Sequence, residues 1–424
     1  MCTRAICLLS VGLLAAQTAA DPGATAKKAL DLMLAGKYQE LNQMFTPDGQ
    51  KTYSLDALTK LGETIKSWGA PSNIGAPAVN RPGANFVVTI PVSFSRQNIN
   101  FTIAVDPQGK LVVFLSRPGE VSWQRPPYSK PEAFKERPVV VGSGDWKLPG
   151  FLTVPSGAGP FPGIVLVHDS GPNDRDETVF GTKIFRDLAE GLSSRGIVVL
   201  RYEKRTRQYA PKMATLAAKT TVKEETVDDA VAALAALRAQ PEVNQQKTYV
   251  LGFGLGGYLG PRIAAADPKL DGLVIMAGMA RPLEDVLVDQ FAYTGTTGKD
   301  LDGVKAQAAR VKALDSGDTD SPPIMGMSAA YILDLKGYDP VATLKSMPPR
   351  VLVLQGERDF QTTIKDFNLW KNGLAGRKDT TFRSYPALNH LMTPGQGKST
   401  EAEYKKPGHV DPQVIDDLAK WLAQ

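Results

Sequence analysis

Beyond about residue 139, the chain contains five apolar runs that each end in turn residues: "PGIVLVH", "GIVVLRY", "KTYVLG", "LDGLVIMAG" and "PRVLVLQG". Runs that are apolar throughout and rich in β-branched residues are typical of strands covered on both faces, as in a parallel sheet. Segments with helical periodicity lie between them, including "TKIFRDLAEGLSSRG" and "KEETVDDAVAALAALRAQ". This alternation predicts a doubly wound α/β domain over residues 139–424.

Two further features belong to this predicted domain. "RPVVVGSG" and "LPGFLTVPS" precede the apolar runs and indicate an opening antiparallel pair of strands. A long insertion over residues 279–345, which contains "SPPIMGMSAAYILDL", is mostly helical in pattern. We expect the insertion to form a lid.

A smaller domain is predicted over residues 22–117. Helical patterns come first, and the extended runs "ANFVVTIPVSFS", "QNINFTIAVD" and "KLVVFLSRP" follow. The turn signal Asp106-Pro107-Gln108-Gly109 predicts that the last two runs pair as a hairpin. Helices followed by an antiparallel sheet indicate an α+β fold. Five prolines from Pro118 to Pro138 predict a linker over residues 118–138, because proline disfavours regular helix and sheet.

The first 20 residues have the pattern of a secretory signal. Arg4 supplies a positive charge, the segment from Ala5 to Ala16 is apolar, and small residues precede a predicted cleavage near Ala20. We therefore expect export to the periplasm or the medium, with no membrane association after cleavage. Later apolar runs are too short to cross a bilayer.

Composition excludes several classes of function. A net charge of +5 over 424 residues gives no reason to expect the concentrated basic face of a nucleic-acid-binding protein. Both cysteines lie in the predicted signal, so the mature chain offers no disulfide and no thiolate ligand. The three histidines, His168, His390 and His409, have no spacing typical of a zinc site. We predict no metal and no cofactor.

The segment "YVLGFGLGGYLGPRIA", residues 249–264, has the pattern of a strand, a glycine-rich turn and a helix. Gly252, Gly254 and Gly257 match the dinucleotide-binding pattern G-x-G-x-x-G. That pattern requires an acidic residue at the end of the next strand. Here the next strand ends in Met-Ala-Gly, and Asp271 precedes it. Dinucleotide binding is therefore disfavoured.

The same segment also matches the nucleophile elbow G-x-S-x-G, except that Gly254 stands in place of serine. An elbow requires an acid and then a histidine at the carboxyl ends of later strands. Asp359 in "VLVLQGERDFQ" and His390 in "YPALNHLM" follow extended runs in that order. The elbow geometry also predicts a positive φ at Gly254, which glycine adopts without steric cost.

On these motifs, residues from about 139 to 424 resemble an α/β-hydrolase of the exported bacterial serine esterase type. "VLVHDSGPNDRDET", "RGIVVLRYEKRT", "GERDFQTT" and "LNHLM" are similar to that family's site segments, in the same order. The resemblance extends to the small α+β domain that precedes the hydrolase domain in this group. It implies a mostly parallel sheet with a helical lid and a small ester-like substrate or ligand.

The resemblance also identifies site residues. Gly254 holds the nucleophile's place, while Asp359 and His390 hold the places of the acid and the base. The backbone N–H groups of Leu255 and of Asp169 or Ser170 would form the oxyanion hole. The sequence departs from the family at Phe253 and Gly254, where His-Ser is usual, and at His168-Asp169, where His-Gly is usual.

These departures affect the chemistry. Glycine has no side-chain atom, so no acyl-enzyme can form at Gly254. A carboxylate at Asp169 would repel a developing oxyanion unless its side chain turned away. We therefore expect a ligand-binding protein in which serine-type ester hydrolysis is weak or lost. The alternative is an ester hydrolase in which His390 and Asp359 activate water, or in which Ser170 substitutes as nucleophile.

Overall fold

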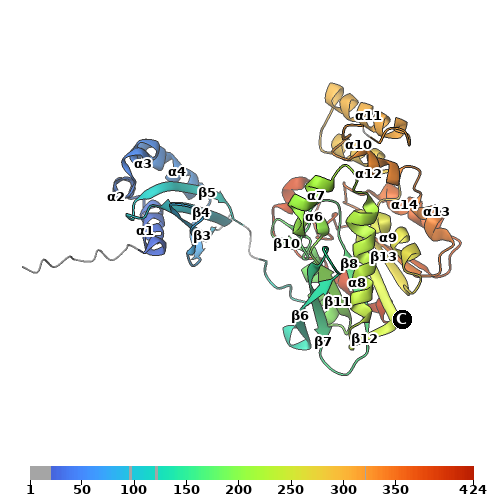
Figure 1. The fold of residues 1–424 in the computed structure, drawn as a ribbon. Coiled ribbons are helices and arrows are strands. Elements are labelled where there is room, and N and C mark those ends of the chain that lie inside the picture. The colour runs from blue at the N-terminus through green and yellow to red at the C-terminus, as the bar shows by residue number, and fades with distance from the viewer. Residues whose placement is uncertain (1–20, 95–97, 120–122, 320) are drawn as a thin grey trace, which may run out of the picture. The chain divides into compact units, whose positions relative to one another are not determined.

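The computed structural model describes residues 21–94, 98–119, 123–319 and 321–424. The predicted signal, residues 1–20, lies outside the described residues. The chain divides into two compact units between residues 122 and 123 (Figure 1).

The first unit packs four helices against an antiparallel sheet. The helices are α1 (Pro22–Leu34), α2 (Tyr38–Met44), α3 (Pro47–Thr52) and α4 (Leu55–Ser67). The strands are β1 (Pro71–Ile74), β2 (Ala78–Asn80), β3 (Phe86–Phe94), β4 (Asn98–Val105) and β5 (Leu111–Pro118). The predicted hairpin of β4 and β5 is confirmed, and the Asp106 side chain accepts the N–H groups of Gln108 and Lys110 in its turn.

The second unit contains an eight-stranded sheet in the order β15-β14-β13-β12-β8-β11-β7-β6. Its strands are β6 (Phe134–Val141), β7 (Leu148–Pro155), β8 (Phe161–Val167), β11 (Val198–Tyr202), β12 (Val243–Phe253), β13 (Gly272–Met276), β14 (Arg350–Gly356) and β15 (Thr380–Tyr385). β6 and β7 form the expected antiparallel pair, and β7 also runs antiparallel to β11. All other pairings are parallel. The prediction of a mostly parallel α/β fold is confirmed.

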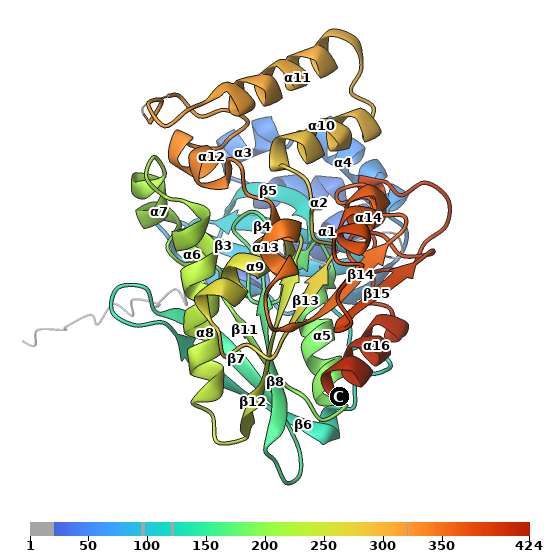
Figure 2. The ribbon, with the colours of Figure 1, turned by 90° about the vertical axis from the view of Figure 1, so that its right-hand side faces the viewer.

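Helices cover both faces of this sheet (Figure 2). On one face, α5 (Ile184–Ser193) and α16 (Pro412–Leu422) bury apolar side chains against the strands. On the other face, α8 (Asp228–Arg238), α9 (Leu255–Ala266) and α14 (Ile364–Gly373) do the same. The strands are apolar throughout because both of their faces contribute to a core.

The predicted linker ends earlier than the sequence indicates. A short 3₁₀ turn, η1 (Pro131–Ala133), leads directly into β6, which begins at Phe134 and contains Pro138. β6 is an edge strand, a position where proline is tolerated because only one side of the strand pairs with a neighbour. The Trp123 indole N–H also donates to Asp187 of α5, at 2.7 Å. Residues from 123 onward are therefore part of the second unit.

The insertion over residues 279–345 contains α10 (Leu283–Tyr293), α11 (Gly298–Ala313), α12 (Ala329–Leu335) and α13 (Pro340–Lys345). Two short helices before α8 are α6 (Arg205–Gln208) and α7 (Ala210–Leu216). In Figures 1 and 2, α10, α11 and α12 lie beyond the end of the sheet from which α9 begins. The insertion thus lies on the side where the parallel strands end.

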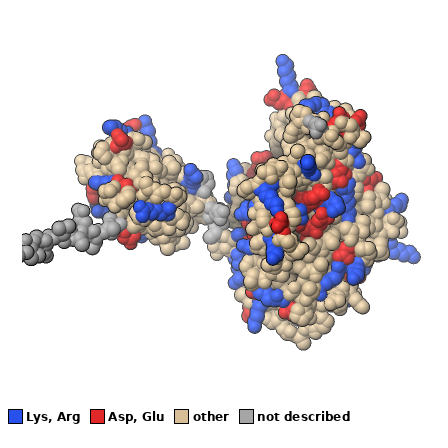
Figure 3. Space-filling model, in the orientation of Figure 1, with Lys and Arg blue, Asp and Glu red and all other residues tan. Residues whose placement is uncertain are grey.

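The surface carries both signs of charge. Lysine and arginine are interspersed with aspartate and glutamate over the visible face of each unit (Figure 3). In the part of the chain that the structure describes, no helix combines the length and apolarity needed to span a bilayer.

Candidate active site

The glycine-rich turn joins β12 to α9 through Gly254. Its φ of 51° confirms the expected positive value. A Cβ atom at Gly256 would lie only 2.5 Å from the carbonyl oxygen of Val167 and 2.7 Å from that of His168. The turn therefore brings the start of α9 into close contact with the end of β8. The residues after β8 reach the elbow for this reason.

Asp359 and His390 come together at the same edge of the sheet. Asp359 follows β14 and His390 follows β15, and His390 Nδ1 lies 2.7 Å from Asp359 Oδ2. Asp359 is only 4% exposed, and its Oδ1 accepts the N–H groups of Gln361 and Thr362. The structure thus brings together the two residues that the sequence analysis expected at this edge of the sheet.

The Asp169 carboxylate occupies the elbow itself. Its Oδ1 accepts the N–H groups of Leu255 and Ser170, both at 2.7 Å, and its Oδ2 lies 3.3 Å from His390 Nε2. A Cβ atom built on Gly254 would overlap this carboxylate. The side chain of Asp169 therefore fills the space that a side chain at position 254 would need.

This arrangement differs from the sequence-based expectation. We expected the Asp169 side chain either to repel an oxyanion or to turn away, and its backbone N–H to be a possible donor to the oxyanion hole. Instead, the N–H groups of Leu255 and Ser170 converge, and the Asp169 carboxylate itself accepts both. One sequence signal could have indicated this. Position 254 has glycine where the family has the larger serine, and position 169 has aspartate where the family has glycine. A side chain lost at one position and gained at the other is the signal.

His390 lies between two carboxylates. Burial alone would lower its pKa from 6.5, but Asp359 and Asp169 outweigh burial and raise the pKa of His390 to about 10. Burial likewise disfavours the charged form of Asp169, yet His390 and the two N–H groups hold its pKa below the ordinary value. With its pKa raised this far, we expect His390 to be an imidazolium at neutral pH, held between the carboxyl groups of Asp359 and Asp169. An imidazolium has no lone pair on Nε2, so His390 cannot act there as a base.

We expect these three side chains to make stability depend on pH. The pKa of His390 is raised in the folded chain, so its stabilising contribution is complete below about pH 6.5 and is lost as the pH rises through about 10. The wild type should therefore be more stable than His390→Gln near pH 6. The difference between their free energies of unfolding should decrease as the pH rises to about 10.5. Urea denaturation of both proteins across this range measures it. A difference that stays constant would show that His390 is not charged in the folded state.

The other predicted residues lie differently. His168 is buried against the rings of Phe185 and Tyr202, and burial together with the charge of Lys204 lowers its pKa to about 3. It is a neutral packing residue. Ser170 is exposed, and among the described residues its hydroxyl forms no hydrogen bond with His390. His409 pairs with Asp187, at 3.2 Å, away from the elbow.

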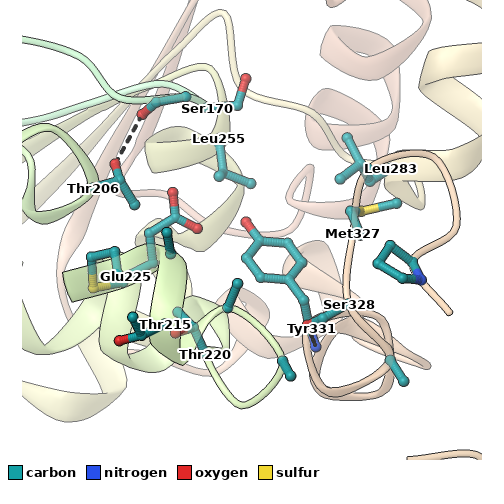
Figure 4. A pocket seen from close by; sticks show the side chains of 18 of the residues that line it. Ser170, Thr206, Thr215, Thr220, Glu225, Leu255, Leu283, Met327, Ser328 and Tyr331 are labelled. Carbon is teal, nitrogen blue, oxygen red and sulfur yellow. Dashed lines mark hydrogen bonds between the residues drawn. The ribbon is translucent and has the colours of Figure 1, made fainter. Parts of the chain in front are cut away.

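Two cavities meet at Ser170. The larger, of about 790 Å³, is lined by Leu255 of the elbow, by residues of α7 and by residues of the insertion over residues 279–345 (Figure 4). The smaller, of about 480 Å³, contains Asp169 and His390 together with aromatic side chains, among them Phe253 and Phe360. The elbow therefore borders both cavities, through Leu255 and Phe253, and each cavity has a volume typical of small-molecule sites.

The larger cavity has an apolar wall and a few polar groups. Figure 4 shows Glu225, from the π-helical turn η2 (Lys223–Val227), and Tyr331, from α12, extending into the cavity toward each other. Glu225 pairs with the buried Lys204 at 2.8 Å, and the same Lys204 ammonium donates to the Asp169 backbone carbonyl. The cation next to the cavity is thus already neutralised.

Comparisons with known proteins identify the relatives of this chain. Residues 148–300 match the Dienelactone hydrolase family. Esterase EstD of Thermotoga maritima is 40% identical over 337 residues, which cover 78% of each protein. A putative dienelactone hydrolase from Klebsiella pneumoniae is 19% identical, with a TM-score of 0.41, over 69% of this chain and 99% of that one. An esterase of Pyrococcus furiosus is 13% identical, with a TM-score of 0.44, over 72% and 98%. With 40% identity to an esterase over more than two thirds of both proteins, the chain belongs to the dienelactone hydrolase family of α/β-hydrolases.

Proposed function

We propose that this member of an ester-hydrolase family binds a small molecule at the elbow but does not hydrolyse esters through an acyl-serine. The position of the Asp169 carboxylate carries the proposal. Acyl transfer needs a nucleophilic atom at position 254 and free N–H donors for the carbonyl oxygen of the substrate. Gly254 supplies no such atom, and the N–H groups of Leu255 and Ser170 already donate to Asp169.

The negative charge of Asp169 also opposes ester hydrolysis. An ester carbonyl that becomes tetrahedral develops negative charge next to the oxyanion donors. At this elbow that charge would meet the ionised Asp169. In serine hydrolases that lack a triad member, a residual advantage of about 10³–10⁴ over water comes from the oxyanion hole and substrate binding. Here the oxyanion hole is filled, so even that residual activity should be smaller.

The cavities support a binding role. The larger, at about 790 Å³, falls within the range of about 300–1,000 Å³ that is typical of small-molecule sites. Leu255, Leu283 and Met327 give it an apolar lining, while Glu225 and Tyr331 supply polar contacts. We therefore expect a mostly apolar ligand, ester-like in size, with one or two hydrogen-bonding groups.

A second candidate function is hydrolysis by water that His390 activates. The 2.7 Å contact between His390 and Asp359 favours it, because an oriented histidine is the usual general base. This route needs neutral His390, and the pKa of His390 is raised to about 10. A route through Ser170 lacks the hydrogen bond between nucleophile and base. Ligand binding without hydrolysis is therefore better supported than either hydrolytic route.

Hydrolysis of p-nitrophenyl acetate and butyrate tests the proposal. At neutral pH, we expect the wild type and His390→Ala to hydrolyse both esters at the same background rate. A wild-type rate that is clearly higher, and that His390→Ala abolishes, would refute the proposal. If this excess appears only near pH 10, His390-activated water is the route, since the imidazole is neutral there.

A further inference from the structure

The two oxygens of Asp169 have different surroundings. Oδ1 accepts two backbone N–H groups, from Leu255 and Ser170, which fix the plane of the carboxylate. Within the described residues, the hydrogen-bond partner of Oδ2 is His390 Nε2, at a long 3.3 Å. The Asp169 side chain is 21% exposed and borders the cavity of about 480 Å³. One oxygen is thus anchored, while the other can reach a molecule in the cavity.

We propose that Asp169 is itself a nucleophile, which displaces halide from a short alkyl halide to form an aspartyl ester that His390 and Asp359 then hydrolyse. Carboxylates form such covalent intermediates when they are held in place and ionised. The premise shared with the proposed function is that Asp169 fills the place of the missing serine. The added claim is a second activity on a different class of substrate.

The surroundings of Asp169 favour an sp³ carbon over an acyl carbon. Attack on an ester carbonyl creates a new oxyanion on the substrate, and the N–H donors of Leu255 and Ser170 are not free to bind it. Displacement at an alkyl carbon creates no such oxyanion. Its negative charge develops on the leaving halide, on the far side of the carbon from Asp169. The phenyl rings of Phe253 and Phe360 give the cavity apolar surface that suits a short alkyl chain.

In the first step, an Asp169 Oδ2 lone pair forms the new O–C bond, and the C–X electron pair leaves with the halide. The ester is neutral, so one of the two carboxylates that hold the proton on His390 has lost its charge. The pKa of His390 then falls and its proton passes to solvent. Asp359 remains hydrogen-bonded to Nδ1 and orients the neutral imidazole for the second step.

In the second step, His390 takes a proton from water as the water oxygen bonds to the ester carbonyl carbon of Asp169. The negative charge that develops on Oδ1 lies between the N–H groups of Leu255 and Ser170, which now serve as an oxyanion hole. Collapse breaks the ester C–O bond, and the departing alcohol takes the proton from His390. The second water proton, left on the new Asp169 carboxylic acid, then passes to His390 and restores the imidazolium between two carboxylates. The sum is alkyl halide plus water giving alcohol, halide and one proton.

The test uses the full mature chain and bromobutane, with bromide and butanol as readouts. We expect the wild type to release bromide continuously, and Asp169→Asn to fall to the rate without enzyme. His390→Gln should release about one bromide per chain and then stop, because the ester can form but not hydrolyse. Peptide mass spectrometry should find the butyl group on Asp169. Asp302→Asn, which removes an exposed carboxylate of α11, should behave as the wild type.

Heavy-oxygen water provides a check that does not depend on how any variant folds. Attack on the carbonyl carbon places the heavy oxygen in the wild-type Asp169 carboxylate during turnover, whereas direct displacement by water places it only in butanol. Bromide release without label in Asp169 would overturn the proposal. The proposal would also be overturned if the wild type released no bromide and His390→Gln formed no adduct on Asp169. Neither result would affect the proposed lack of ester hydrolysis, which the p-nitrophenyl esters measure separately.

Discussion

The double variant Gly254→Ser, Asp169→Gly is expected to hydrolyse p-nitrophenyl butyrate at least about a thousandfold faster than the wild type, because it restores a complete triad and empties the oxyanion hole. The introduced hydroxyl would stand in the space that the Asp169 carboxylate now occupies. His390 would lose one of its two carboxylate neighbours, and its pKa should fall toward the range of a general base.

Neither single variant should suffice. In Gly254→Ser alone, the new Cβ overlaps the Asp169 carboxylate, and the φ of 51° strains any residue other than glycine. In Asp169→Gly alone, the N–H groups of Leu255 and Ser170 are freed, but no nucleophile exists. The two changes act at one place, so their effects on the rate should be strongly non-additive.

Steady-state kinetics on the wild type, both single variants and the double variant measure this effect. A phosphonate ester that labels nucleophilic serines should modify only the double variant, at the introduced serine. His390→Ala in the double background is the control, and it should return the rate to that of the wild type. If the double variant folds but is no faster than Asp169→Gly, the elbow does not have the geometry of a serine site.

Asp366→Ala is expected to lower the free energy of unfolding of the second unit by about 3–5 kcal/mol, the usual cost of removing one partner from a buried ion pair. Asp366 is 0% exposed. It accepts the N–H groups of Ala280 and Arg281 and two further bonds from the Arg281 guanidinium, at 2.9 and 3.1 Å. These bonds fix the point where the insertion over residues 279–345 leaves the sheet. Without Asp366, the two backbone donors lose their acceptor.

Asp289→Ala is the matched control, because it removes a carboxylate from the same arginine. Asp289 contacts Arg281 at 2.8 Å but is 34% exposed, so its loss should cost less than about 1 kcal/mol. Urea denaturation followed by tryptophan fluorescence compares the two variants. Equal losses would mean that burial does not determine the strength of these contacts.

The sequence alone determined the fold and the edge of the sheet where the site lies. Apolar runs alternating with helical segments required a parallel sheet with helices on both faces, because only that arrangement buries both faces of each strand. The carboxyl ends of parallel strands meet at one edge, so Asp359 and His390 could be placed together from their positions after two runs. The glycine elbow fixed the sign of φ at Gly254 and the lack of a nucleophilic atom there.

The sequence was less informative where tertiary context overrides local preference. The prolines of residues 118–138 predicted a linker that extends to Pro138, but β6 includes that proline because it lies on an edge of the sheet. The prolines in a sequence show which residues lack a backbone N–H donor. Only the sheet order shows whether a missing donor matters.

Only the tertiary structure determined what Asp169 does and which charge His390 carries. The Asp169 carboxylate reaches the N–H group of Leu255, 86 positions away, because α9 packs against the end of β8. The pKa of His390 is raised because carboxyl groups from two distant loops flank its ring. A side-chain direction and a pKa depend on neighbours that only folding brings within a few ångströms. The sequence could therefore show that the serine was missing, but not that a carboxylate had taken its place.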